Sequence, residues 1–140
     1  MSAKYLFGYA FFALLPLLLM ACGATEEASE PRVFFTSPED GATVSSPVKF
    51  EWSAEDFTIE PAGEIHEGAG HLHLMIDTAC LEPGTIIPAD DNHVHFGKAQ
   101  TEASFSLAPG EHTICLQAAD GVHAALEGEG MTQVIKITVE

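Results

Sequence analysis

The residues after about position 32 form a series of short segments in which apolar and polar side chains alternate. This alternation is clear in residues 48–52, in residues 101–107 and in residues 134–139. A period of two residues matches a β-strand with one buried face, whereas a helix would repeat every 3.6 residues. No window of the sequence has a sustained helical period, and there is no internal repeat. The alternation therefore restricts this chain to β structure.

Turn-forming clusters of proline, glycine and aspartate separate these segments, for example at residues 37–41, 61–63 and 109–110. The segments that could form strands are residues 33–35, 48–52, 57–59, 71–77, 85–87, 93–96, 101–107, 112–117 and 134–139. Roughly seven short strands in about 110 residues are typical of an immunoglobulin-like sandwich. We predict a single all-β domain over residues 32–140, an antiparallel immunoglobulin-like β-sandwich with Trp52 in its core.

Residues 1–21 have the pattern of an export signal. The single charge of Lys4 precedes an apolar run from Leu6 to Met20, shorter than the roughly 20 residues of a membrane-spanning helix. The run ends in Leu19-Met20-Ala21-Cys22, which resembles the lipobox of bacterial lipoproteins. The resemblance implies cleavage before Cys22 and a lipid on this cysteine. A plain secretory signal cleaved nearby is the alternative.

A lipoprotein signal implies that the mature chain is attached to a membrane through its N-terminal lipid, in the cell envelope. Gly23 rather than aspartate follows Cys22, which favours the outer membrane facing the periplasm, or the cell surface. Residues 22–31 are small and acidic and are predicted to be a flexible tether.

The mature chain is strongly acidic. Its 21 acidic residues face only Arg32, Lys49, Lys98 and Lys136, which gives a net charge of −17 once Lys4 is removed. Such a surface repels nucleic acid, so we expect no nucleic-acid partner. The charge suits the collection of cations, but solubility in a salty or extracellular setting explains it equally well. The sequence indicates no particular protein or glycan partner.

The two cysteines that remain, Cys80 and Cys115, are predicted to form a disulfide, because paired cysteines outside the cytoplasm are usually oxidised. The disulfide would close a loop of about 35 residues, worth on the order of 3–4 kcal/mol in the chain-entropy model. The alternative is that both cysteines are thiolate ligands of a metal.

Two His-x-His pairs lie in strand-like sequence, His71-Leu72-His73 and His93-Val94-His95. Residues two apart in a strand share a face and lie roughly 6.5 Å apart, so two imidazoles can converge on one ion at roughly 2.0–2.1 Å. Neighbouring strands would bring all four imidazoles together. We predict a metal site whose ligands are His71, His73, His93, His95 and His123.

Three further residues are additional candidates for this site: His112, Met75 and His66. Imidazole suits zinc, copper and nickel, and the general order of affinities favours copper. The thioether of Met75 would help to bind Cu(I), although methionine more often fills gaps. Copper is therefore the first expectation and zinc the second. The alternative is a polar histidine face without a metal.

Several motifs resemble an exported bacterial family known as domain of unknown function 4399. They are Val-Phe-Phe at 33–35, Ser-Pro-Glu-Asp-Gly-Ala at 37–42, Ser-Pro-Val at 46–48, Pro-Ala-Gly at 61–63, residues 68–77, Ile-Pro at 87–88, residues 93–102 and residues 109–113. The block at 93–102 is the most specific. The family pattern includes both His-x-His pairs, His112 and a histidine near His123, and often a histidine where this chain has Leu72. The resemblance implies export and this fold, but no activity.

Taken together, these features favour an envelope lipoprotein that carries, buffers or senses copper or zinc. One alternative is a non-catalytic immunoglobulin-like adhesion or interaction module with a structural histidine cluster. Another is a copper redox enzyme of the superoxide dismutase type, which also has a His-x-His on a strand. The sequence contains no serine elbow, phosphate loop or Cys-x-x-Cys. We therefore assign no catalytic residue and favour a protein that is not an enzyme.

Overall fold

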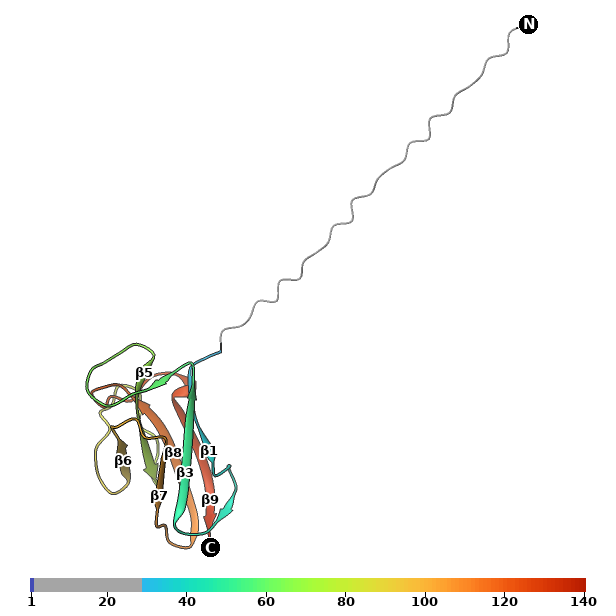
Figure 1. The fold of residues 1–140 in the computed structure, drawn as a ribbon. Helices are drawn as coiled ribbons and strands as arrows, with labels where there is room; N and C mark the ends of the chain where they lie inside the picture. The colour runs from blue at the N-terminus through green and yellow to red at the C-terminus, as the bar shows by residue number, and fades with distance from the viewer. Residues whose placement is uncertain (2–28) are drawn as a thin grey trace.

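The computed structural model describes Met1 and residues 29–140. The predicted signal segment beyond Met1, the lipidation site Cys22 and most of the tether lie outside these residues. The described chain is an all-β sandwich of two sheets (Figure 1). Among the described residues, no helix has the length and apolar character needed to cross a membrane.

The smaller sheet has three antiparallel strands in the order β1-β3-β7. Its strands are β1 (Arg32–Ser37), β3 (Val48–Glu55) and β7 (Glu102–Phe105). In the larger sheet the order is β2-β9-β8-β5-β4, and β6 also pairs with β5. Its strands are β2 (Thr43–Val44), β4 (Thr58–Ile59), β5 (Ala69–Ile76), β6 (His93–Phe96), β8 (Gly110–Ala119) and β9 (Thr132–Val139).

The predicted all-β sandwich is confirmed, with two differences in detail. The pairs β2–β9 and β4–β5 are parallel, and a short 3-10 helix, η1 (Glu129–Met131), precedes β9. The prediction of a strand at residues 85–87 was wrong, because this segment makes only an isolated bridge between Ile86 and Ala124. Backbone hydrogen bonds join residues 84–87 to residues 123–125, but Pro88 has no N–H with which to extend the pairing.

The main core lies between the two sheets, where the apolar residues of each alternating segment meet. Trp52 is 2 % exposed, and its ring lies 4.6 Å from that of Phe96. Leu72 and Leu74 of β5 face this core, and full burial of such side chains contributes roughly 1.5–3 kcal/mol each. The position of Trp52 in the core is thus as predicted.

The opposite face of β5 is buried as well, so the whole strand is shielded from solvent. Met75 packs there against Ile87, Cys115 and Ala125 in a second, smaller core. The predicted disulfide between Cys80 and Cys115 is present. It attaches the segment 78–92 to β8 and holds it over the outer face of the larger sheet.

Gln117 fastens the same segment through two hydrogen bonds with one residue. The backbone N–H of Leu81 donates to Gln117 Oε1 at 2.9 Å, and Gln117 Nε2 donates to the Leu81 carbonyl at 2.7 Å. Gln117 is 1 % exposed and stands opposite His73 in the pairing of β5 with β8. The buried side of the histidine strand is therefore covered by a segment that is fixed at adjacent points.

Candidate metal centre

The strands that carry the two His-x-His pairs are neighbours. β5 and β6 pair antiparallel, with His73 opposite His95 and Met75 opposite His93. Since side chains directly opposite each other project to the same face, this register brings one pair of imidazoles together and places His93 farther along the strand.

Four imidazole rings gather on this face, from β5, β6 and the loop that follows β8. Ring centroids lie 4.7 to 5.9 Å apart for every pairing of His71, His73, His95 and His123. Ligand nitrogens of His71, His95 and His123 lie within 4.8 Å of one another. His71 Nε2 and His73 Nε2 are hydrogen-bonded at 3.0 Å. Residues 50 positions apart in sequence thus contribute to one histidine cluster.

Two of the four rings are kept neutral by burial. His71 and His73 are 0 % and 1 % exposed. Burial, followed by the proximity of the other histidines, lowers the pKa of His71 to about 4 and that of His73 to about 3. Burial and then His123 lower the pKa of His95. Neutral imidazoles present free lone pairs, which is the form that binds metal ions.

The two buried rings also contain unsatisfied nitrogens. Among the described residues, neither His71 Nδ1 nor His73 Nδ1 has a hydrogen-bond partner. In a neutral pair joined Nε2 to Nε2, the accepting ring carries its proton on Nδ1, so a buried N–H has no acceptor. Such a group costs about 1–3 kcal/mol and is rare in native structures unless it has a function.

His123 is held in a conformation that few residues adopt. Its φ is +74°, in the left-handed region, where strain is typical of functional sites. Asp120 fixes this loop, because its Oδ1 accepts hydrogen bonds from the N–H groups of Val122 and Ala124, each at 2.9 Å. The His123 carbonyl accepts from Ile87 N–H at 2.9 Å. The position of the His123 ring is thus set by the backbone conformation of this loop.

Two glycines that the sequence analysis missed position the histidines of β6 and the β8 loop. A Cβ on Gly97 would overlap Cε1 and Nε2 of His95, and one on Gly121 would overlap the Glu64 carbonyl. The loop 60–68 ties both segments together, since Ala62 N–H donates to the Gly97 carbonyl at 3.1 Å and Gly63 N–H to the Gly121 carbonyl at 2.8 Å. Gly97, two residues after His95, was the feature of the sequence that could have indicated close packing around this histidine.

Three of the predicted site residues lie apart from the histidine cluster. His93 Nδ1 is hydrogen-bonded to Asp90 Oδ1 at 2.8 Å. His66 lies in the exposed loop 60–68, with its Nδ1 2.8 Å from Glu60 Oε1. Met75 is fully buried in the second core.

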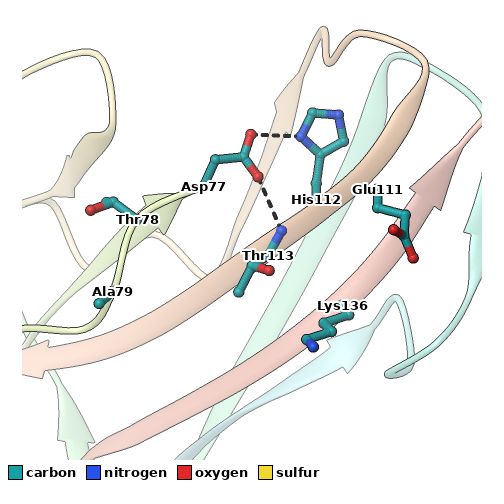
Figure 2. A pocket seen from close by; sticks show the side chains of 7 residues that line it. All are labelled: Asp77, Thr78, Ala79, Glu111, His112, Thr113 and Lys136. Carbon is teal, nitrogen blue, oxygen red and sulfur yellow. Dashed lines mark hydrogen bonds and ion pairs between the residues drawn. The ribbon is translucent and has the colours of Figure 1, made fainter.

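His112 also lies elsewhere, beside Asp77 at the end of β5 (Figure 2). Its Nδ1 donates to Asp77 Oδ2 at 2.7 Å and its Nε2 to the Ala108 carbonyl at 2.8 Å. Asp77 Oδ1 accepts from Thr113 N–H at 3.0 Å. The Ala108 carbonyl and then the Asp77 carboxylate raise the pKa of His112. Because each ring nitrogen faces an acceptor, this site favours the protonated form of His112, which has no free lone pair.

Fold and site together define an all-β sandwich domain that carries a histidine cluster on the covered outer face of its larger sheet. Residues 48–140 match the model of the family described as "Domain of unknown function (DUF4399)". The chain belongs to this family. Neither the curated proteins nor the solved structures include a match to this chain.

Proposed function

We propose that this protein binds one transition-metal ion at His71, His73, His95 and His123, with copper the first expectation and zinc the second. The observation that carries the proposal is the approach of ligand nitrogens from three separate segments to within 4.8 Å of one another. Ligands at roughly 2.0–2.1 Å from a common ion must lie within about 4 Å of each other. A small rearrangement of rings is enough to meet this requirement.

Burial and protonation support the same proposal. The buried pair of His71 and His73 contains an Nδ1–H without an acceptor, and such a group is rare in native structures unless it has a function. Because the pKa values of both rings are lowered, a cation need not displace protons from them at neutral pH.

The choice of metal follows from the donor atoms. All four donors are imidazole nitrogens, which suit copper, zinc and nickel, and affinity for a given site is highest for Cu(II). With Met75 packed in the second core and Cys80 and Cys115 joined in a disulfide, the soft sulfur donors that would favour Cu(I) are engaged elsewhere. Cu(II) is therefore the preferred ion.

The exposure of the ligands supports carriage, buffering or sensing. His71 and His73 are buried, His123 is half-buried and His95 is exposed. A structural metal site is closed on all sides, whereas here one ligand meets solvent. An ion bound at such a site can enter and leave past His95.

Titration of the purified protein with Cu(II), Cu(I) and Zn(II) salts tests the proposal. We expect Kd below about 1 µM for Cu(II), which is about −8 kcal/mol. His95→Ala should weaken binding by about 100-fold, which is about 2.8 kcal/mol. His93→Ala is the matched control, because it removes the same side chain two residues away on β6 and should leave Kd unchanged. Equal affinity of both variants for every ion would overturn the proposal.

The envelope location is part of the proposal and rests on the sequence of residues 1–22. We infer that the mature chain begins at a lipidated Cys22 and displays the domain outside the cytoplasm. Mass spectrometry of the protein from membranes should find an acylated N-terminal cysteine, and Cys22→Ser should abolish this mass shift. An unmodified mature terminus elsewhere would contradict lipidation.

A further inference from the structure

A groove of about 830 Å³ is lined in part by Asp120 and Leu126, which flank the His123 loop in sequence, and the metal proposal does not use it. It is bounded by residues 30–31, 65–69 and 126–131, with Phe57 and Asp120 also in its wall. Its floor is mostly apolar and includes Phe57, Leu126 and Met131, while Ile65 stands 62 % exposed at the edge. Grooves of roughly 300–1,000 Å³ with apolar walls are the usual size for small organic ligands.

The rim of this groove is unusually acidic even for this chain. Five of its 15 lining residues carry a carboxyl group: Glu30, Glu67, Asp120, Glu127 and Glu129. The whole chain has 21 acidic residues in 140, so carboxyl groups are about twice as frequent here. No lysine or arginine of residues 29–140 contributes to this lining. His66 does, but its Nδ1 is paired with Glu60.

These carboxyl groups are too dispersed to hold a single metal ion. Among the described residues, ligand atoms of three or more candidate groups come within 4.8 Å only in the histidine cluster. Ca²⁺ would need six to eight oxygens at 2.3–2.6 Å. The groove therefore combines an apolar floor with a diffuse negative rim, which fits an extended ligand with a separate charged group.

We propose that this groove binds an amphipathic organic cation, an amine or quaternary ammonium carried on an apolar body. Its apolar part would cover Phe57, Leu126 and Met131 and release water from them. Its cationic group would lie among the carboxylates of the rim, chiefly Glu127 and Glu129. An aromatic wall such as Phe57 adds to the attraction, because ring faces attract ammonium groups by roughly 0.5–2 kcal/mol.

Asp120 and the loop 60–68 connect the groove to the segments that carry the clustered histidines. Asp120 lines the groove and also holds the loop of His123. The groove does not include any of the four clustered histidines. Binding of the organic cation therefore does not require the metal, and each proposal can fail without the other.

Three probes of the same shape test the inference on the purified protein: 2-phenylethylamine, 2-phenylethanol and phenylacetate. We expect saturable binding of the amine, with NMR shift changes concentrated at Phe57, Leu126 and Met131. The alcohol should bind about 10-fold more weakly, which corresponds to about 1.4 kcal/mol, and the anion should not bind. Amine binding that equals alcohol binding, or shift changes centred elsewhere, would overturn the proposal.

Two double variants separate the groove from the overall charge of the protein. Glu127→Gln/Glu129→Gln removes two rim charges and should weaken amine binding by about 10-fold. Glu39→Gln/Glu111→Gln removes two exposed charges outside the groove and should leave it unchanged. Equal weakening by both pairs would mean that the net charge alone attracts the amine, and the groove would carry no site.

Discussion

Two histidine environments in this domain have opposite chemistry, although both lie on the larger sheet. In the histidine cluster, burial lowers the pKa of His71 and His73, and each has a ring nitrogen without a partner. At His112 both nitrogens donate, and the Ala108 carbonyl and the Asp77 carboxylate raise the pKa. The comparison teaches that a histidine's role follows from its acceptors. Rings without acceptors keep a lone pair that can bind a cation, whereas a ring with two acceptors is stabilised in its own cationic form.

The largest expected contrast is in the dependence of metal-free stability on pH. Because the pKa values of His71 and His73 fall to about 4 and about 3 on folding, the unfolded state binds more protons below about pH 6.5. The free energy of unfolding should therefore fall as pH drops, by up to about 1.4 kcal/mol per pH unit for each ring. His112, with a raised pKa, stabilises the fold below about pH 6.5 and loses this contribution as pH rises through its folded pKa.

Urea unfolding from pH 4 to pH 9 in the presence of a chelator measures both effects. His71→Leu/His73→Leu should flatten the acid side relative to wild type, and His112→Gln should flatten the side above pH 6.5. An unchanged acid side in the double variant would show that carboxyl groups alone cause the loss, and the comparison would fail.

The second contrast is stabilisation by metal. Saturating Cu(II) at about 100 times Kd should raise the free energy of unfolding by about 2.7 kcal/mol. His112→Gln should keep this increment, because His112 has no free lone pair. His95→Ala should lose it. Thermal unfolding with and without Cu(II) measures the difference, and loss of the increment in both variants would remove the distinction between the two environments.

The third contrast concerns deletion of the side chains. His112→Ala should cost about 1–2 kcal/mol, since it removes a charged hydrogen bond to Asp77, a carboxylate that is partly exposed and keeps its bond from Thr113 N–H. His71→Leu/His73→Leu should change metal-free stability by less than about 1 kcal/mol, because both members of an incompletely bonded pair become apolar. Chemical denaturation at pH 7 compares them. A greater loss in the leucine variant would indicate that the histidine cluster is structural.

The smallest effect on metal binding is expected from substitution of Gly97, which lies against the His95 ring. Gly97→Ala should displace the imidazole and weaken Cu(II) binding by about 10-fold, or about 1.4 kcal/mol. Gly41→Ala is the control, because its φ of +80° makes alanine strained while its surroundings leave room. The control should lower stability by about 1 kcal/mol without changing Kd. Equal Kd values for both variants and wild type would exclude a positioning role for Gly97.

The alternation of apolar and polar residues was enough to predict the sandwich. The cysteine count predicted the disulfide partners. The two His-x-His pairs predicted three of the clustered histidines, His71, His73 and His95. The sequence could not exclude His93, because the 16 residues between β5 and β6 do not fix their register as a two-residue hairpin would. A register with His73 opposite His95 places His93 opposite Met75 instead, where Asp90 binds it.

The burial of His71 and His73 was also beyond the sequence. Alternation predicts that one face of a strand is covered. Here the other face is covered as well, by the segment 78–92 at Met75 and by the rings of His95 and His123 at the two histidines. His123 was a candidate because of its position after Ala118-Ala119-Asp120-Gly121, but its approach depends on Asp120 and a left-handed backbone. Such tertiary contacts leave no periodic trace in a sequence.

The segment 78–92 links three parts of the molecule in turn. Cys80 joins it to Cys115 by the disulfide. Leu81 is hydrogen-bonded to Gln117, the residue opposite His73. The N–H of Ile87 donates a hydrogen bond to the His123 carbonyl. One covalent bond therefore begins a sequence of contacts that ends at a proposed ligand. The disulfide and a proposed metal ligand are thus held by the same segment. Reduction of the disulfide would leave all four histidines in the chain, and we expect it to loosen the segment whose Ile87 N–H holds the His123 carbonyl.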